Sequence, residues 1–388
     1  MLISLVLFFG ILQIGVASSI SKRDTFDAAR AYHSSLNALW STFWNDDRVA
    51  FNFNDPACSS DFRHVSVWDM AVAGKAIVDS GDLTRTRQVL SALQRYQNSD
   101  GWFASNPGGN DIYIDDNAQV VYVYLDAYAL TFNSDYLTTA TNLMRLIQTQ
   151  WSSAGGVVWK KDAPYVASIS TTEAALAAAR LYEYNFDSTL LEFSKSCLSW
   201  MEQHLTDPSD GFYYDGLDRD TRQVNRGKLT YTIGVAISTY AYLFKFTGDQ
   251  AYVNHATDKA SATLTKPVFL SSNGAWNNIL PYVHLLFAGF ADLITIARIH
   301  GYNPALNKQA SFIYKYDQYD NSGHYSWYTS VRTLYDNYVK STGDSSIAFS
   351  LDSSCYCSGN ASQPRRTVLV DGSAAQIFHS MTRISAFD

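Results

Sequence analysis

The sequence predicts an all-α protein in which helical hairpins close into a ring, an (α/α)6 toroid. Apolar residues recur at i, i+3, i+4 and i+7 along most of the chain, and few stretches alternate with period two. Short elements that join glycine to an aromatic residue recur roughly every 50 to 60 residues, about the length of one hairpin with its loops. About six such units fill residues 24–388, which we expect to form one domain. An open helical array is the alternative, but its repeats should be tighter than these.

The expected helices follow one another in pairs along the chain. Many end at a Gly-Asp, Asn-Ser or Asp-Pro dipeptide, which stops a helix. A single hairpin cannot bury its apolar face, so neighbouring hairpins must stack, and closing the ring removes the exposed ends. The expected segments are 24–43, 67–80, 83–97, 118–132, 136–149, 171–184, 188–204, 229–247, 251–263 and 280–300.

The Gly-aromatic elements lie between the helix pairs. We expect them to gather at one end of the inner helices, to form the floor of a cleft there, and to supply its catalytic groups. They are residues 100–103, 155–159, 210–216, 273–277 and 322–327.

The N-terminus has the pattern of a secretory signal. An apolar stretch ends in the small residues Ala17-Ser18-Ser19, so we expect residues 1–19 to be a cleaved signal peptide and the protein to be secreted and extracellular. Residues 20–23 contain Lys22-Arg23, a dibasic propeptide site that would start the mature chain at Asp24. No second long apolar run and no hydrophobic C-terminal tail are present, so neither a membrane span nor a glycolipid anchor is expected.

Cysteines and one sequon fit an exported chain. Four cysteines suffice for two structural disulfides, whose connectivity the sequence leaves open. They are Cys58, Cys197, Cys355 and Cys357. Asn360-Ala361-Ser362 is a sequon among serines and glycine, so Asn360 is the expected glycosylation site on an exposed loop.

Composition limits the classes of partner. The net charge is −7, with no basic cluster beyond Arg365-Arg366, which argues against nucleic acid or an anionic membrane as partner. The 26 tyrosines and 9 tryptophans suit a polysaccharide or oligosaccharide, because the C–H faces of sugars stack on aromatic rings. No phosphate-binding loop, nucleophile elbow or histidine-based site is present. We expect a monomer that uses no metal and no cofactor.

The candidate catalytic residues are Asp115 and Asp116, at the start of an expected helix that follows the glycine-rich residues 106–110. Glycosyl transfer through a covalent intermediate needs two carboxyl groups about 5 Å apart, and adjacent residues on a first helical turn, about 100° apart, provide this. Two like charges so close raise one pKa, while the helix N-terminus keeps the other group ionised. The alternative is a purely structural helix cap.

Other residues are candidates for binding the sugar. Asn117 and Asp215 offer hydrogen bonds to hydroxyl groups, although Asp215 before Gly216 also suits a simple turn. Six rings are candidate stacking platforms, and core packing is the alternative for each of them. They are Trp68, Trp102, Tyr113, Trp159, Tyr214 and Trp276.

The run Tyr113-Ile114-Asp115-Asp116-Asn117-Ala118, after Gly101-Trp102 and before Ala127-Tyr128, resembles the signature of glycoside hydrolase family 76, the endo-α-1,6-mannanases. The resemblance implies an (α/α)6 barrel without metal and a retaining mechanism, with Asp115 as nucleophile and Asp116 as acid/base. It also implies mannan endo-1,6-α-mannosidase activity on the α-1,6-linked mannan backbone. Weaker similarities lie at 68–71, 79–82, 170–173, 178–182, 214–216, 231–234 and 246–249.

The chain departs from the family pattern at positions expected to contact sugar. Thr232-Ile233 stands where the family usually has Asn-Gln, Thr172 stands where it often has Asn, and residues 273–278 differ from its Gln- and Phe-rich element. Two alternatives to hydrolysis therefore stay open. One is a cell-wall transglycosidase acting on mannan or glycolipid glycan, and the other is a glycan-binding toroid without catalysis.

Overall fold

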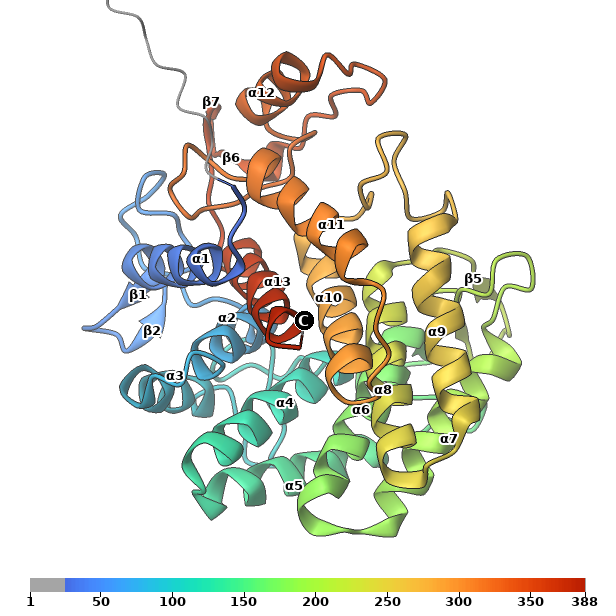
Figure 1. The fold of residues 1–388 in the computed structure, drawn as a ribbon. Helices are drawn as coiled ribbons and strands as arrows, with labels where there is room; N and C mark the ends of the chain where they lie inside the picture. The colour runs from blue at the N-terminus through green and yellow to red at the C-terminus, as the bar shows by residue number, and fades with distance from the viewer. Residues whose placement is uncertain (1–24, 388) are drawn as a thin grey trace, which may run out of the picture.

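The computed structural model describes residues 25–387, which form 13 α-helices, and all of these except α12 are arranged as a ring of two layers (Figure 1). In the inner layer each helix packs on the next, and the last packs on the first, which closes the ring. The predicted (α/α)6 toroid is confirmed. The inner helices are α2 (Val67–Val78), α4 (Ile114–Thr131), α6 (Ser168–Asn185), α8 (Thr230–Thr247), α10 (Leu280–Thr295) and α13 (Val368–Ser385).

The outer layer covers the inner one. Helices α3, α5, α7 and α9 each pack on the inner helix that precedes them, α11 contacts α13, and α1 also packs on α13. The first and last helices of the described chain therefore form one of the pairs that close the ring. The outer helices are α1 (Ala28–Phe43), α3 (Leu83–Gln94), α5 (Ser134–Gln148), α7 (Ser188–His204), α9 (Gln250–Thr265) and α11 (Asn303–Tyr316).

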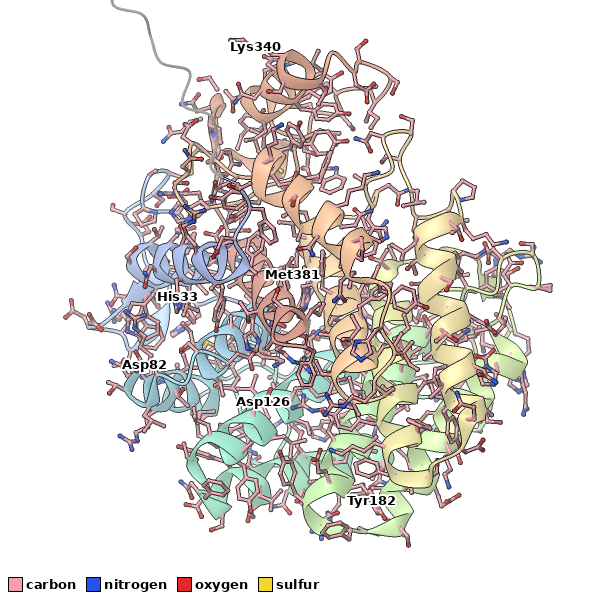
Figure 2. All side chains as sticks on the ribbon, viewed as in Figure 1. His33, Asp82, Asp126, Tyr182, Lys340 and Met381 are labelled. Atoms are coloured by element: carbon pink, nitrogen blue, oxygen red, sulfur yellow. A yellow bond between two sulfur atoms is a disulfide. The ribbon has the colours of Figure 1, made fainter. Side chains whose placement is uncertain are left out.

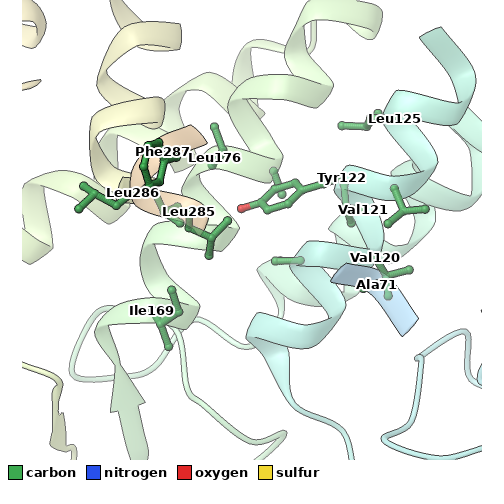
Figure 3. Packing of buried hydrophobic residues seen from close by; sticks show 14 of the residues in the cluster. Ala71, Val120, Val121, Tyr122, Leu125, Ile169, Leu176, Leu285, Leu286 and Phe287 are labelled. Carbon is green, nitrogen blue, oxygen red and sulfur yellow. The ribbon is translucent and has the colours of Figure 1, made fainter. Parts of the chain in front are cut away.

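The two layers differ in how their helices are buried. Outer helix α5 buries Ala140, Leu143, Met144 and Ile147, which is the one-faced spacing of an amphipathic helix. Inner helix α6 is buried continuously over residues 168–179 because neighbours surround it. Side chains fill the inside of the ring, as Figures 2 and 3 show.

Helices α8 and α10 approach most closely at two glycines. A Cβ atom on Gly234 would lie 2.3 Å from the Leu285 carbonyl oxygen, and one on Gly289 would lie 2.3 Å from the Gly234 carbonyl oxygen. Any side chain would push the two backbones apart, so these positions require glycine.

The Gly-aromatic elements are tight turns that follow outer helices. Each is closed by an isolated antiparallel bridge, such as Gln97 with Phe103 or Leu270 with Trp276, and each contains a glycine with positive φ. Most of their rings are buried, including Phe103, Phe212 and Trp276. These turns therefore lead the chain back to the next inner helix, and their buried rings fill part of the core.

Short strands and a small insertion complete the described chain. Strands β1 (Trp44–Asn45) and β2 (Ala50–Phe51) form a hairpin, and β3 (Tyr165–Ala167), β4 (Gly216–Asp218) and β5 (Val224–Asn225) form an antiparallel sheet that leads into α6. Between α11 and α13 lie α12 (Arg332–Thr342), a 3-10 turn (Ser353–Cys355), and the antiparallel pair β6 (Tyr356–Cys357) and β7 (Asn360–Pro364).

One disulfide, Cys58–Cys357, joins the loop after β2 to strand β6. Of the two disulfides that four cysteines would allow, the described residues form this one, while Cys197 is enclosed within the core on α7 and Cys355 is unpaired. No helix of residues 25–387 combines the length and the hydropathy that crossing a membrane requires. The expected signal peptide and the Lys22-Arg23 site lie outside the described residues.

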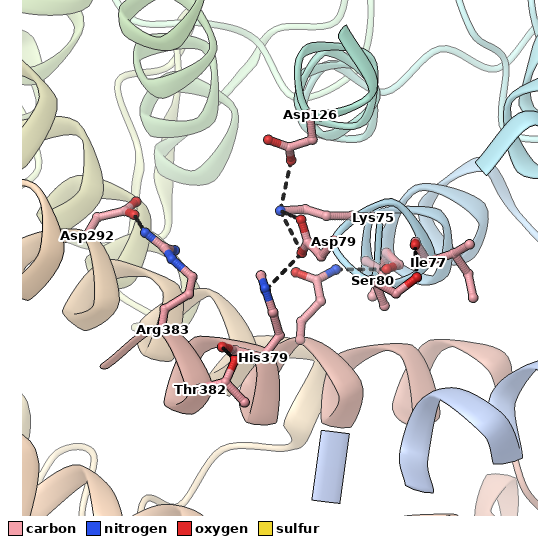
Figure 4. A network of polar contacts seen from close by, with 12 residues as sticks. Lys75, Ile77, Asp79, Ser80, Asp126, Asp292, His379, Thr382 and Arg383 are labelled. Carbon is pink, nitrogen blue, oxygen red and sulfur yellow. Dashed lines mark hydrogen bonds and ion pairs between the residues drawn. The ribbon is translucent and has the colours of Figure 1, made fainter. Parts of the chain in front are cut away.

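A network of charged side chains occupies the C-terminal ends of the inner helices (Figure 4). Lys75 of α2 contacts both Asp79 and Asp126, and Asp126 also pairs with Arg180 of α6. Arg383 of α13 pairs with Asp292 of α10 at 2.6 Å. The network surrounds a cavity of about 180 Å³. Acidic and basic groups thus tie five of the inner helices together at this end.

Candidate active site

The opposite end of the ring holds a cleft of about 510 Å³. It is lined from the beginnings of inner helices: Trp68 on α2, Asp115 and Asp116 on α4, Tyr231 on α8 and Tyr282 on α10. Helix N-termini carry partial positive charge, so their convergence here favours negative charge in the cleft. Among the described residues that line it, there is no lysine or arginine.

Asp115 and Asp116 occupy the first turn of α4 and share the cleft. Burial raises the pKa of the Asp115 carboxyl to about 6, and the charge of Asp215 adds to this shift. The indole Nε1 of Trp159 opposes it by donating to Asp115 Oδ2 over 3.1 Å. Burial and then the neighbouring Asp115 charge raise the pKa of Asp116 well above its ordinary value. Of this pair, Asp116 therefore holds its proton more strongly than Asp115.

Besides the aspartate pair and the exposed Asp111, the carboxyl group of Glu173 lies in the same cleft. It projects from the second turn of α6 and is fully buried. Its Oε1 accepts a hydrogen bond from Gln119 Nε2 over 3.0 Å. Burial, followed by the charges of Asp115 and Asp116, raises the pKa of Glu173 well above its ordinary value.

Three of the six predicted stacking rings line the cleft. Trp159 is 43% exposed and its ring lies 4.9 Å from that of Tyr113, centroid to centroid. Trp68 lines the cleft from α2. Lys160 stands over the Tyr113 ring and pairs with Asp111, which holds the rim of the cleft next to these rings.

Trp102 and Trp276 lie elsewhere, and each is only 3% exposed. Trp276 donates its Nε1 proton to the Thr263 carbonyl oxygen and packs on Phe287 and Phe290. Neither ring lines the cleft, because both plug the core below a Gly-aromatic turn. Among the Gly-aromatic turns, only residues 155–159 contribute a side chain to the cleft, that of Trp159. We expected the catalytic groups to come from these turns, and the structure does not match that expectation. The carboxyl groups come from helix beginnings instead.

Asn117 is buried and bonded to backbone rather than open to a substrate. Its Oδ1 accepts from the Phe103 N–H over 2.9 Å, and its Nδ2 donates to the carbonyl oxygens of Phe103 and Tyr113. These bonds fix the turn at 100–103 against the start of α4. The structure therefore gives Asn117 a supporting position and not a place among the cleft-lining residues.

Tyr214 and Asp215 lie beside the cleft without lining it. Asp215 Oδ2 accepts hydrogen bonds from Tyr165 Oη and from Asn225 Nδ2. The Tyr214 ring faces Arg226 and Lys228. Asp215 still acts on the site through its charge, which raises the pKa of Asp115 and of Tyr231. Asn360 is exposed on β7, far along the chain from these residues, and its side chain bonds to Ser362.

Several cleft residues were not among the sequence candidates. Gln119 follows Asp115 by one helical turn, so its spacing alone places it on the same helix face. Glu173 is an acidic residue inside an otherwise small and apolar helical run, which is a usable signal of function. Tyr231, Tyr282 and Leu285 had no such signal, because aromatic and leucine side chains are ordinary core residues.

Comparisons with known proteins identify a family and several relatives. A family model described as glycosyl hydrolase family 76 matches residues 27–351. The meiotically up-regulated gene 191 protein of Schizosaccharomyces pombe is 30% identical over 239 residues, 54% of this chain and 53% of that protein. A mannan endo-1,6-α-mannosidase of Candida glabrata is 31% identical over 127 residues, 30% of this chain and 28% of that protein. The chain thus spans about half the length, or less, of these curated relatives.

Solved structures share the fold. A GH76 α-mannanase of Bacteroides thetaiotaomicron superposes with a TM-score of 0.75 at 16% identity, covering 93% of this chain and 97% of that one. An inactive α-1,6-mannanase variant of a Salegentibacter species, with two consecutive aspartates changed to asparagine and bound to α-1,6-mannotriose, gives 0.72 at 18% identity, covering 93% and 100%. Dfg5 of Chaetomium thermophilum in complex with glucosamine gives 0.67 at 14% identity, covering 93% and 91%.

Proposed function

Because the chain belongs to glycosyl hydrolase family 76, we propose that it hydrolyses internal α-1,6-mannosidic bonds of mannan with retention of configuration. One observation carries the proposal. Two adjacent carboxyl groups share a cleft and hold their protons with different strength, so one is a base and the other an acid at the same pH.

The proposed reaction assigns one role to each aspartate. Ionised Asp115 attacks the anomeric carbon and forms a glycosyl ester, while Asp116 gives its proton to the departing glycosidic oxygen. Asp116, now ionised, takes a proton from water, and the oxygen of that water displaces Asp115 from the sugar. At the end of the cycle Asp116 is protonated and Asp115 is ionised, so both groups have returned to their starting states.

Aromatic rings around the pair suit a polymeric sugar. Trp68, Trp159 and Tyr231 present rings to the cleft, and rings with an apolar face and a polar edge match a pyranose. The Candida glabrata relative is named a mannan endo-1,6-α-mannosidase, and the Salegentibacter protein is an α-1,6-mannanase that was made inactive at two consecutive aspartates. Both names support the substrate class proposed here. An extracellular or cell-wall location belongs to the same proposal.

The test is incubation of the full protein with linear α-1,6-mannan, followed by mass spectrometry of the products and NMR of the new anomeric centre. We expect oligosaccharides with the α configuration at their new reducing ends. Asp115→Asn and Asp116→Asn should each lower kcat at least about 1000-fold. The matched control is Asp135→Asn, an aspartate in the first turn of outer helix α5, which should keep full activity.

Other products would point to the alternatives. Longer oligosaccharides that appear only when an acceptor sugar is added would indicate transglycosylation through the same glycosyl ester. Binding of mannan without any product, unchanged by Asp115→Asn, would contradict the proposed enzyme and favour a glycan-binding protein.

A further inference from the structure

One oxygen of the Glu173 carboxyl has a hydrogen-bond partner in the protein and the other has none. Gln119 Nε2 donates to its Oε1 over 3.0 Å, and the Tyr122 hydroxyl donates to its backbone oxygen over 2.9 Å. Its Oε2 is buried and has no hydrogen-bond partner among the described residues. Since buried polar atoms are normally bonded, an unpartnered oxygen in a cleft marks a place for a ligand group.

The surroundings of Glu173 decide its charge. Asp115, Asp116 and Tyr122 face it from α4, and Tyr231 faces it from α8. No described lysine or arginine lines the cleft to neutralise a third carboxylate. Burial and the charges of the two aspartates therefore raise the pKa of Glu173 well above the ordinary value and favour its neutral form.

The position of the proton follows from the hydrogen bond to Gln119. Because Gln119 donates to Oε1, the carboxyl proton belongs on Oε2. A protonated Oε2 is a hydrogen-bond donor that finds no acceptor in the described protein. The acceptor must then come from whatever fills the cleft.

We propose that Glu173 is a specificity-determining residue that donates a hydrogen bond from its neutral carboxyl to a hydroxyl group of the sugar bound over Asp115 and Asp116. This inference rests on the proposed function. A sugar that lacks the hydroxyl, or carries it in another orientation, leaves the Oε2 donor unpaired and is rejected.

Two substitutions separate this role from others. Glu173→Gln keeps the shape, the acceptor for Gln119 and a neutral donor, so kcat/KM on α-1,6-mannan should stay within about threefold of wild type. Glu173→Met has similar volume and no donor, so kcat/KM should fall about tenfold or more. The control is Ser170→Ala, which removes a buried, unpartnered hydroxyl from the same helix outside the cleft and should change nothing.

Mono-deoxy α-1,6-mannotriosides identify the partner hydroxyl. Wild type should lose about tenfold in kcat/KM on one deoxy compound, and Glu173→Met should lose nothing further on that compound. The pH–rate profile of Glu173→Gln should superpose on that of wild type. Equal losses in the Gln and Met variants, or a shifted acid limb in the Gln variant, would mean that Glu173 acts in its ionised form and would overturn the proposal. Full activity of the Met variant would also overturn it.

The proton on Glu173 can be observed without turnover. The infrared difference spectrum of wild type minus Glu173→Gln at pH 7 should show a protonated carboxyl band, and a carboxylate band in its place would contradict the inference. If wild type leaves mannan intact, the proposed function fails. The spectrum, together with calorimetric binding of α-1,6-mannotriose to the three forms, then still decides the role of Glu173.

Discussion

At the scale of single residues, the chemistry of the cleft depends on what surrounds Asp115. Trp159 donates to Asp115 Oδ2 over 3.1 Å and so favours the ionised carboxylate, which is the form that attacks sugar in the proposed reaction. The same indole is exposed to the cleft and lies beside Tyr113. One side chain therefore has two separable contributions, a hydrogen bond and a stacking face.

Trp159→Phe separates these contributions. A smaller aromatic ring remains but the N–H donor is lost, so the pKa of Asp115 should rise above its value of about 6. Because activity requires ionised Asp115, the acid limb of the pH–rate profile should move to higher pH, with a several-fold larger loss at pH 6 than at pH 8. Trp151→Phe is the control, since that indole packs on Phe193 away from the cleft. An equal loss at all pH values would mean that Trp159 acts by stacking alone.

Asp115 should also lower stability at neutral pH. Its folded pKa of about 6 is above its ordinary value of 3.8, so the folded state binds more protons, and stability falls as pH rises between these values. Asp115→Asn removes this penalty and should be more stable than wild type by about 1–3 kcal/mol at pH 7, with little difference at pH 3.5. Urea unfolding at both pH values tests this. A difference that does not change with pH would argue against the raised pKa.

Some of the site could be predicted from the sequence because its residues are neighbours in the chain. Asp115 and Asp116 share a first turn, and that alone suggested two coupled carboxyl groups. Glu173 and Tyr231 meet them only because α6 and α8 begin at the same end of the ring, and no local pattern carries that information. Composition likewise could not separate Trp159, which faces the cleft, from Trp276, which plugs the core.

At the scale of elements, one side chain positions the start of α4. Asn117 bonds to the Phe103 N–H and to the carbonyl oxygens of Phe103 and Tyr113, so it joins a Gly-aromatic turn to the helix that carries both aspartates. A site on a helix beginning is only as well placed as that helix, and the proposed chemistry tolerates little displacement.

Asn117→Ala should therefore reduce both stability and kcat. The buried N–H and carbonyl groups of Phe103 lose their partner, and the Tyr113 carbonyl keeps only the Asn117 N–H, which should together cost about 2–4 kcal/mol in the free energy of unfolding. The first turn of α4 would shift, so we expect kcat to fall about tenfold with KM nearly unchanged. Asn142→Ala, at an exposed position on α5, should stay within about 0.5 kcal/mol of wild type. A large rise in KM with normal stability would return Asn117 to the substrate-binding residues.

Helix pairing could be predicted, whereas several helix limits could not. The segment 188–204 matches α7, an outer helix with one buried face. Helix α4 begins at Ile114 rather than at residue 118, because the polar residues of its first turn face the cleft and interrupt the apolar period. Helix α13 was not among the expected segments. Its consecutive residues Gly372, Ser373 and Ala374 are all buried, so the sequence does not alternate between an apolar and a polar face as an amphipathic helix does.

At the scale of the whole molecule, the ring has two chemically different ends. Helix N-termini meet at the cleft that holds Asp115, Asp116 and Glu173, and helix C-termini meet at the network that contains Lys75, Arg180 and Arg383. The helix dipoles favour an ionised Asp115 at the first end and these three cations at the second. Leu285 of α10 borders both spaces, and Tyr122 and Leu176 extend the layer between them (Figure 3). The two ends should therefore respond separately to mutation.

Asp126→Asn tests this separation at the network. Asp126 pairs with Lys75, as Figure 4 shows, and also with Arg180. Its neutralisation therefore leaves two largely enclosed cations with less negative charge beside them. Breaking such pairs from one side costs about 3–5 kcal/mol, which urea unfolding measures. Glu192→Gln is the control, because it breaks an exposed ion pair with Lys195 that should be worth less than about 1 kcal/mol.

Since the apolar layer isolates the cleft, folded Asp126→Asn should keep the wild-type kcat and pH–rate profile at low temperature. A change in the acid limb would show instead that the network and the carboxyl groups of the cleft are electrostatically coupled through the ring.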